Sequence, residues 1–450
     1  MVTTGDTKMT IYNLVSFLGM FALMGLAWLI SSNKRKMNWR VIGWGITLQM
    51  LFALFVFQVP AGTSAFLFIN RVVVRLLDSA SAGTQFVFGR LALPPGATNA
   101  DGETSLGFIL AFQAFPTIVF FSALMSILYF YRILPLIIRG FAYVFTRLMR
   151  VSGAESLCTA SNIFVGIESA LTIKPHLEKM TRSELCTVLT AGMATVASNV
   201  LALYVFCLHE VFPNIAGHLI SASILSAPAA LVMSKIILPE TGEPETLGKT
   251  VEVHYERENT LFEAIINGAN AGVKLIFGIV ALLLAVLGLV ALVDLVFVSF
   301  GSRLNTLMGL GIDWSLKGLL GYLFYPFTLV IGVPISDAWT ISKIIGERTV
   351  ATEVAGYKDL AAVLAGNLLQ HPRSAVLATY ALCGFAHVAS LAIFVGGMSA
   401  LAPSRAGDLA KVGIRALVAA TLACLLTACI AGVFLPVAAD KSILLGNVPM

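Results

Sequence analysis

The chain has 450 residues, of which 58% are hydrophobic and 12% are charged, and its mean hydropathy is +0.89. Soluble globular domains carry about 25% charged residues, so the composition excludes an ordinary soluble protein and indicates a membrane protein. The net charge of +5 is spread over short loops, without the concentrated basic patch that binds nucleic acid, so no nucleic-acid partner is expected.

The apolar segments of the chain predict the crossings of a lipid bilayer, each of which takes about 20 residues. Basic residues from Lys34 to Arg40 follow the first segment directly. By the positive-inside rule they lie in the cytoplasm, which places the N-terminus outside. Later basic clusters continue the alternation to an outside C-terminus. Eight spans are expected, at 11–31, 41–59, 108–130, 184–208, 214–237, 275–299, 375–400 and 416–437.

The segments between the spans carry their own signals. Residues 63–90 mix apolar and charged positions, as an amphipathic helix at the membrane interface does, and residues 92–106 form a polar outer loop. Arginines after the third span indicate a cytoplasmic amphipathic helix, and the charged loop 239–260 also lies inside. We divide the chain into five parts: 1–107, 108–237, 238–299, 300–400 and 401–450.

Two further apolar segments contain too many polar residues to be simple spans. Residues 154–175 have Gly166 and Glu168 in their middle, and residues 315–345 have a tip that carries Pro334 and Asp337. Non-helical backbone at membrane depth is tolerated only where protein buries it or where it lines a cavity. Each segment therefore predicts a re-entrant hairpin, the first from the cytoplasm and the second from outside.

One heptapeptide occurs twice, as Gly192-Met193-Ala194-Thr195-Val196-Ala197-Ser198 and as Gly384-Phe385-Ala386-His387-Val388-Ala389-Ser390, with five of seven positions identical. The two copies lie on spans of opposite direction, and each follows one of the predicted hairpins. This arrangement predicts an inverted-topology repeat, which is typical of secondary transporters whose site lies where the repeats meet.

Charged side chains at membrane depth cost about 2.5–3.5 kcal/mol, so Glu168 and Asp337, at the two predicted tips, are candidate functional groups. Each could instead pair with a basic residue for structural reasons or lie at an aqueous surface. Glu168 and Asp337 could also act as the acid–base pair of a membrane-embedded enzyme, although the repeat and the absence of a nucleophile or metal-ligand cluster in the sequence count against that function.

Three uncharged polar positions are further candidates. Asn162 and Thr195 offer oxygen atoms that, with the free carbonyls of broken helices, can coordinate a dehydrated cation, or else form hydrogen bonds between helices. His387 stands in the second heptapeptide where Thr195 stands in the first. It can bind a polar solute, carry a proton or satisfy a buried neighbour. For Ser198 and Ser390 the default interpretation is helix packing.

Four short motifs together resemble the concentrative nucleoside transporter family of bacterial type. The resemblance implies an all-α polytopic membrane protein with eight transmembrane helices and two re-entrant hairpins, built from a scaffold domain and an inverted-repeat transport domain. It also implies a homotrimer in the inner or plasma membrane that imports nucleosides with Na⁺, or with H⁺ in some members. The motifs are Ser161–Gly166, Gly332–Pro334, Ala381–Ala386 and Leu401–Pro403.

The resemblance also assigns site residues. Na⁺ would be held by the side chains of Asn162 and Thr195 and by the backbone carbonyls of Val165 and Val196. The solute would contact both hairpin tips and the second heptapeptide, through Ile167, Glu168, Ser169, Asp337, Phe385, His387 and Ser390.

Several motifs of the solute site depart from the family pattern. The first tip reads Gly166-Ile167-Glu168-Ser169 instead of Gly-Gln-Thr-Glu, and the second reads Ile335-Ser336-Asp337 instead of Trp-Asn-Glu. His387 replaces an asparagine, and the signature Asn-Glu-Phe-Val-Ala becomes Thr352-Glu353-Val354-Ala355-Gly356. Sites built from buried hydrogen bonds discriminate strongly between solutes. The solute is therefore an unusual nucleoside, a restricted subset of nucleosides or another polar solute, and a passive channel is a further alternative.

Overall fold

The structure is a computed structural model that describes residues 10–99, 102–254, 258–435 and 445–446, and within these ranges every regular element is a helix, which confirms the all-α prediction. The N-terminal part contains α1 (Ile11–Leu29), α2 (Trp39–Gln58), α3 (Pro60–Phe88), η1 (Gly89–Ala92) and α4 (Leu110–Gln113). The α3 helix covers the predicted interfacial segment.

The rest of the chain has the same order of elements twice: an outer helix, a short helix, a helical hairpin, a broken helix and a long buried helix. The first set is α5 (Phe115–Phe130), α6 (Ile133–Met149), α7 (Gly153–Ser161), η2 (Ile167–Lys179), α8 (Arg182–Ala194), α9 (Ser198–Leu208) and α10 (Ile215–Ile237). The second set is α11 (Leu261–Met308), α12 (Leu316–Val330), α13 (Ile335–Ala351), α14 (Glu353–Ala365), α15 (Pro372–Leu382), α16 (Val388–Leu401) and, after η3 (Pro403–Arg405), α17 (Ala406–Phe434). We call these two sets repeat one and repeat two.

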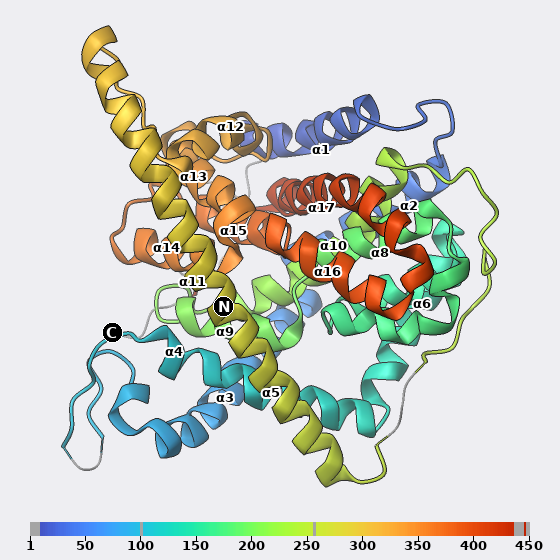
Figure 1. Cartoon of the computed structure of the whole chain (residues 1–450), viewed down its shortest axis with the longest axis horizontal. Coiled ribbons are helices and arrows are strands. Elements are labelled where there is room, and N and C mark those ends of the chain that lie inside the picture. The colour runs from blue at the N-terminus through green and yellow to red at the C-terminus, as the bar shows by residue number, and fades with distance from the viewer. Residues whose placement is uncertain (1–9, 100–101, 255–257, 436–444, 447–450) are drawn as a thin grey trace.

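Helices α8, α10, α15 and α17 pack against one another at the centre of the molecule (Figure 1). Small residues make this close approach possible, and α10 and the C-terminal half of α17 are buried on nearly all sides. By contrast, α11 runs diagonally across the front of the molecule in Figure 1 and packs mainly against α5. Its 48 residues span about 72 Å at 1.5 Å per residue, which exceeds the thickness of a bilayer. The helix must therefore tilt or project from the membrane.

Among the described residues, seven helical segments are long and apolar enough to cross a membrane, and each overlaps one of the eight predicted spans. The remaining span, 375–400, is broken into α15 and α16. The basic loops meet on one face, where Ser32 N donates to Ile237 O (3.0 Å), Arg40 Nε to Leu148 O (2.9 Å) and Arg405 to Glu178 O (2.8 Å). Their common face agrees with the cytoplasmic placement inferred from charge.

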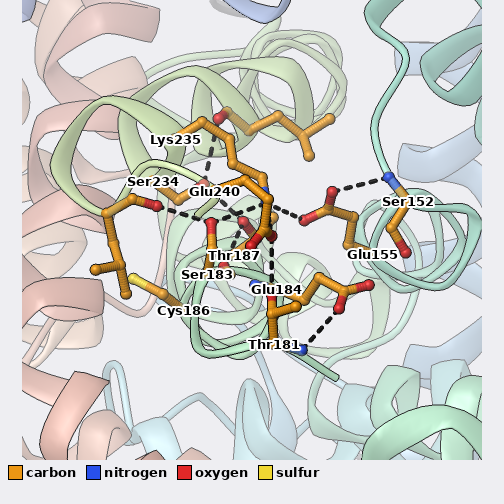
Figure 2. Close-up of polar contacts among 12 residues, drawn as sticks. Ser152, Glu155, Thr181, Ser183, Glu184, Cys186, Thr187, Ser234, Lys235 and Glu240 are labelled. Carbon is orange, nitrogen blue, oxygen red and sulfur yellow. Dashed lines mark hydrogen bonds and ion pairs between the residues drawn. The ribbon is translucent and has the colours of Figure 1, made fainter. Parts of the chain in front are cut away.

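A buried polar cluster anchors the base of the first hairpin on this face (Figure 2). Lys235 of α10 pairs with Glu155 of α7 (2.8 Å) and donates to Ser183 of α8 (3.0 Å), so three elements are tied to one ammonium group. Glu184 accepts from the backbone N–H of Thr181 (2.8 Å) and so completes the N-terminal cap of α8. The cluster fixes the hairpin at its base and leaves its tip to lie at the centre of the molecule.

The second hairpin is not where the sequence predicted it. The turn between α12 and α13 lies against α1 and α15, since Ser16 Oγ of α1 donates to Ile331 O (2.8 Å) and Arg373 Nε of α15 donates to Gly332 O (3.1 Å). The counterpart of α7–η2 is α13–α14, whose tip is Thr352, with φ 89°. Glycine and proline at 332 and 334 resemble a hairpin tip in sequence but form a buried turn outside the candidate cavity. The real tip uses a left-handed threonine, which no sequence rule predicts for a β-branched residue.

Candidate functional site

Both heptapeptides interrupt a helix, whereas the sequence analysis placed each of them within a continuous span. Helix α8 ends at Ala194 and α9 begins at Ser198, and α15 ends at Leu382 and α16 begins at Val388. Gly384 has φ 132°, and a β-carbon there would lie 2.7 Å from Ala194 O, so glycine is required both by conformation and by the close approach of the two breaks. Backbone carbonyls are thereby freed from helical hydrogen bonds in the middle of the molecule.

The predicted cation ligands lie on two adjoining segments of repeat one. Asn162 caps the C-terminus of α7, and its Oδ1 accepts from Ser169 Oγ (2.9 Å). Thr195 caps the C-terminus of α8, where its Oγ1 donates to Ala191 O (2.8 Å). The segments are joined directly, because Ser198 N donates to Phe164 O (3.0 Å). Val165 and Val196 lie beside these links, so the structure brings all four predicted ligand residues into one region.

The chemistry of this region suits a small hard cation. The carbonyl ends of α7 and α8 carry partial negative charge, and neither helix has a basic residue in its last turn. Side-chain and backbone oxygens are the donors that such cations prefer. Ser223 of α10 donates to Ile163 O (3.1 Å) and to Val196 O (3.4 Å), which holds the two segments together from a third element. Within the described part of the chain, no group of three or more His, Cys, Asp or Glu could hold a transition metal.

A cavity of about 120 Å³ collects residues from both hairpin tips and both helix breaks. Glu168 comes from the first tip and Glu353 from the second, while Phe385 and His387 come from the second break and Ser390 from the first turn of α16. The outer wall is α11. The remaining lining residues are Gly166, Ala197, Asn199, Val200, Leu275, Ile279, Leu282, Leu283, Thr352, Val354, Ile393 and Phe394. Four of the predicted solute residues therefore share this cavity: Glu168, Phe385, His387 and Ser390.

A chain of polar contacts lies beside this cavity. Tyr204 Oη donates to Glu353 Oε1 (2.7 Å), and Glu353 Oε2 lies 3.0 Å from His387 Nε2. His387 Nδ1 accepts from Ser390 N (3.2 Å), so the imidazole proton is assigned to Nε2, which lies 2.7 Å from Ser390 Oγ and beside the carboxylate. Glu353 is also the first residue of α14, where the helix dipole favours a negative charge. The contacts hold a buried carboxylate and an imidazole in fixed orientations at the cavity wall.

Glu353 and Tyr204 were missed in the sequence analysis. Glu353 is the glutamate that survives in the altered signature Thr352-Glu353-Val354-Ala355-Gly356, and this was the signal that could have identified it. Tyr204 lies in the apolar helix α9 and carries no motif.

Asp337 lies away from both tips. Its carboxylate accepts from the backbone N–H groups of Gln370 (2.9 Å) and His371 (3.0 Å) and from Ser374 Oγ (2.6 Å). These groups lie at the start of α15 and just before it, so the carboxylate ties α13 to the beginning of that helix. The geometry therefore does not support the prediction that Asp337 and His387 reach one solute, and Glu353 takes the place that the sequence analysis gave to Asp337.

We expect Asp337→Asn to lower the stability of the protein without changing its affinity for solute. The amide cannot accept all three hydrogen bonds at this buried helix terminus, and hydrogen bonds to a charged group contribute about 1.5–3 kcal/mol. Thermal unfolding in detergent measures the loss, and solute titration of the same sample measures affinity. A variant of normal stability with weakened solute binding would return Asp337 to the binding site.

The other predicted residues of the first tip lie in different surroundings. Glu168 lines the 120 Å³ cavity and also a second cavity of about 330 Å³ between α5, α11 and the hairpin, which extends past Lys174 and His254 toward the basic face. Ser169 points instead to Asn162 of the cation region. Ile167 begins η2, and its side chain lies outside the described part of the structure.

Three family models match the chain: "Na+ dependent nucleoside transporter C-terminus" over residues 218–432, the corresponding N-terminus over 18–91, and "Nucleoside recognition" over 111–210. Nucleoside permease NupC of Helicobacter pylori is 34% identical over 94% of this chain and 98% of its own length. Solute carrier family 28 member 3 of Mus musculus is 36% identical over 94% of this chain, which spans 59% of that relative's length.

Solved structures are similar over the same extent. A CNTnw variant in an outward-facing state superposes with a TM-score of 0.84 at 32% identity, covering 94% of this chain and 98% of the other. CNTnw in an inward-facing, substrate-bound state gives a TM-score of 0.81 at 32% identity, with the same coverage.

Proposed function

The chain belongs to the Na⁺-dependent nucleoside transporter family, and we propose that it is a secondary active symporter that imports nucleosides with Na⁺ across the cell membrane. It is a multi-pass membrane transporter and not an enzyme. Relatives with solved outward-facing and inward-facing states support an alternating-access mechanism. The two alternatives of an H⁺-driven carrier and a membrane-embedded enzyme are not favoured.

The observation that carries this proposal is the convergence of both hairpin tips and both helix breaks on one cavity beside an oxygen-lined region. A solute in this cavity contacts elements of both repeats at once. Repeat interfaces of this kind are where secondary transporters bind their cargo.

Coupling between ion and solute follows from one hydrogen bond. Ser169 Oγ donates to Asn162 Oδ1, a proposed Na⁺ ligand, and Ser169 directly follows Glu168, a proposed solute ligand. Na⁺ bound by Asn162, Val165, Thr195 and Val196 would hold the first tip against the break between α8 and α9. The solute site is then complete only when the ion is bound, which is the requirement for symport.

For the solute, we assign the sugar hydroxyls to Glu353, His387 and Ser390, whose contacts already form a fixed polar chain. Glu168 is assigned to donor groups of the base, and Phe385 to the face of the base. With Ile167 in place of an amide, the first tip offers fewer hydrogen bonds to a base, so a restricted subset of nucleosides is expected.

The assembly that we propose is a homotrimer in the bilayer. Large apolar side chains on α11 are exposed in the single chain, such as Phe277 at 71% and Leu284 at 73%. Such an apolar surface must be covered by lipid or by other subunits.

We expect Glu168→Gln to weaken binding of the transported nucleoside about 10- to 150-fold. The loss of a charged acceptor costs about 1.5–3 kcal/mol, and each 1.4 kcal/mol is a factor of ten. Equilibrium titration in saturating Na⁺ measures the change. Glu245→Gln is the matched control, because that side chain is 49% exposed and lies on the cytoplasmic loop. Normal affinity of the Glu168 variant for every nucleoside tested would make Glu168 a structural residue.

A counterflow assay in proteoliposomes tests the class of function. Vesicles loaded with unlabelled nucleoside should accumulate labelled nucleoside transiently, because a carrier exchanges the two. A passive channel gives no stimulation by internal solute, and an enzyme converts the label to a product, so either result would overturn the proposal.

A further inference from the structure

The two repeats place the same helix ends together. In repeat one the C-termini of α7 and α8 meet at the proposed cation region, and in repeat two α13 and α15 end near one another in the same way. Each helix C-terminus carries about half a negative elementary charge. Both regions are therefore expected to attract a cation.

In repeat two the last turn of α13 contains Arg348, four residues before the tip at Thr352. Its side chain is completely buried, and Nη1 donates to the carbonyl of Ala381 at the end of α15. Repeat one has no basic residue in the last turn of α7 or α8. The guanidinium thus bridges the ends of α13 and α15 in repeat two. These ends correspond to the ends of α7 and α8, which meet at the proposed cation region in repeat one.

Arg348 differs from the other buried cations of the described chain in having few partners. Lys235 pairs with Glu155 at 2.8 Å and with Glu240 at 3.6 Å (Figure 2). Arg373 donates to four oxygens, those of Gly332, Leu435, Tyr12 and Ser16. By contrast, Nε and Nη2 of Arg348 have no hydrogen-bond partner among the described residues, and no described carboxylate lies within 4.0 Å.

An uncompensated buried charge is strongly destabilising, so its retention requires a compensating field. The partial charges of the two helix ends supply that field. The neighbouring carbonyls are also satisfied by protein groups, since Tyr357 Oη donates to Thr379 O (3.1 Å) and Cys424 Sγ donates to Cys383 O (2.8 Å). Protein donors thus satisfy carbonyls at both breaks, and the difference between the repeats is the guanidinium, which only repeat two places at its helix ends.

We propose that Arg348 is a fixed cation which takes, in repeat two, the place that the mobile Na⁺ takes in repeat one. This inference rests on the proposed function. It assigns one exchangeable cation, not two, to the pair of equivalent positions. It also keeps the second break and the tip that carries Glu353 assembled whether or not Na⁺ is bound, so that the ion controls only the first tip.

Three variants test the role of the charge. Arg348→Lys keeps a positive charge, Arg348→Met keeps an unbranched apolar stem without charge, and Arg348→Ala opens a space into which guanidinium ion can bind. Each is purified in detergent, and its thermal stability is measured in choline chloride, NaCl and millimolar guanidinium chloride. Na⁺-driven uptake of uridine and adenosine is measured in parallel. Arg373→Lys and Arg373→Met are the matched controls.

If the charge is what matters, Arg348→Lys should retain the stability and Na⁺ response of the wild type. Arg348→Met should lose about tenfold or more of the uptake rate, as expected when a hydrogen bond to a charged group is removed. Guanidinium should raise the melting temperature of Arg348→Ala but not that of the wild type. Both Arg373 variants should be impaired alike, because that site needs the geometry of the whole guanidinium.

Equal behaviour of Arg348→Met and Arg348→Lys would make Arg348 a packing residue and overturn the proposal, as would an Arg348→Ala variant that ignores guanidinium. Recovery of only the lysine variant from the membrane supports the charge requirement, and loss of all three contradicts it. If the wild type itself shows no response to Na⁺, the proposed function fails whatever the Arg348 variants do.

Discussion

Replacing Glu353 by alanine should weaken nucleoside binding by about 30- to several-thousand-fold and abolish uptake at ordinary solute concentrations. The carboxylate joins Tyr204 (2.7 Å) to His387 (3.0 Å) at the wall of the cavity, and it is assigned to the sugar of the solute. Removing one partner of a buried, hydrogen-bonded charge pair costs about 2–5 kcal/mol, much of it because the other partners are left unpaired.

The measurement is a nucleoside titration of the purified variant at saturating Na⁺, with Glu353→Gln beside it to separate charge from shape. Asp337→Asn is the control, since both are buried acidic residues of repeat two and only Glu353 lines the cavity. Normal affinity in Glu353→Gln together with lost binding in Asp337→Asn would reverse the assignment of the second tip.

The second large effect concerns the ion. Asn162→Ala and Thr195→Val should each raise the Na⁺ concentration for half-maximal uptake by about 10- to 150-fold, because each removes an oxygen bound to a charged partner, worth about 1.5–3 kcal/mol. Valine matches threonine in shape but lacks the hydroxyl. Initial uptake rates over a range of NaCl, at constant ionic strength with choline, give the constant directly.

Thr195→Ser serves as the control for that series, since it keeps the hydroxyl and should stay near the wild type. Asn162→Ala also loses the acceptor for Ser169, so its solute affinity should fall in parallel with its Na⁺ affinity. Unchanged Na⁺ dependence in both Asn162→Ala and Thr195→Val would remove the proposed cation site from this region.

The structure could be predicted from the sequence where a local residue pattern is compatible with only one kind of structure. Interrupted apolar residues around Gly166 predicted the first hairpin, and the tip lies there, between α7 and η2. Basic clusters predicted which loops share a face. Both signals are local and depend on composition, so no tertiary information was needed.

The second hairpin could not be predicted from local composition. Gly332 and Pro334 have the residue types of a tip, but their turn packs against Ser16 and Arg373, which are distant in sequence. The true tip at Thr352 has a positive φ, which is unusual for a β-branched residue. Asp337 was misplaced for the same reason: a carboxylate that caps a helix and one that binds a solute look alike in sequence.

Buried charges were also hard to predict from sequence. Arg348 lies in an ordinary helical stretch, and only the three-dimensional meeting of α13 with α15 shows that its guanidinium sits at two helix ends. Likewise, the pairing of His387 with Glu353 needs the tip of one hairpin to meet the break of another helix.

Na⁺ should drive nucleoside uptake through the cavity shared by the two tips. The most direct test is uptake of radiolabelled ribonucleosides by proteoliposomes under an inward Na⁺ gradient, compared with an inward H⁺ gradient and with no gradient. Accumulation above equilibrium that requires Na⁺, persists when the pH gradient is collapsed and is lost in Glu353→Ala is the predicted result. Accumulation that ignores Na⁺ and disappears with the pH gradient would contradict the account.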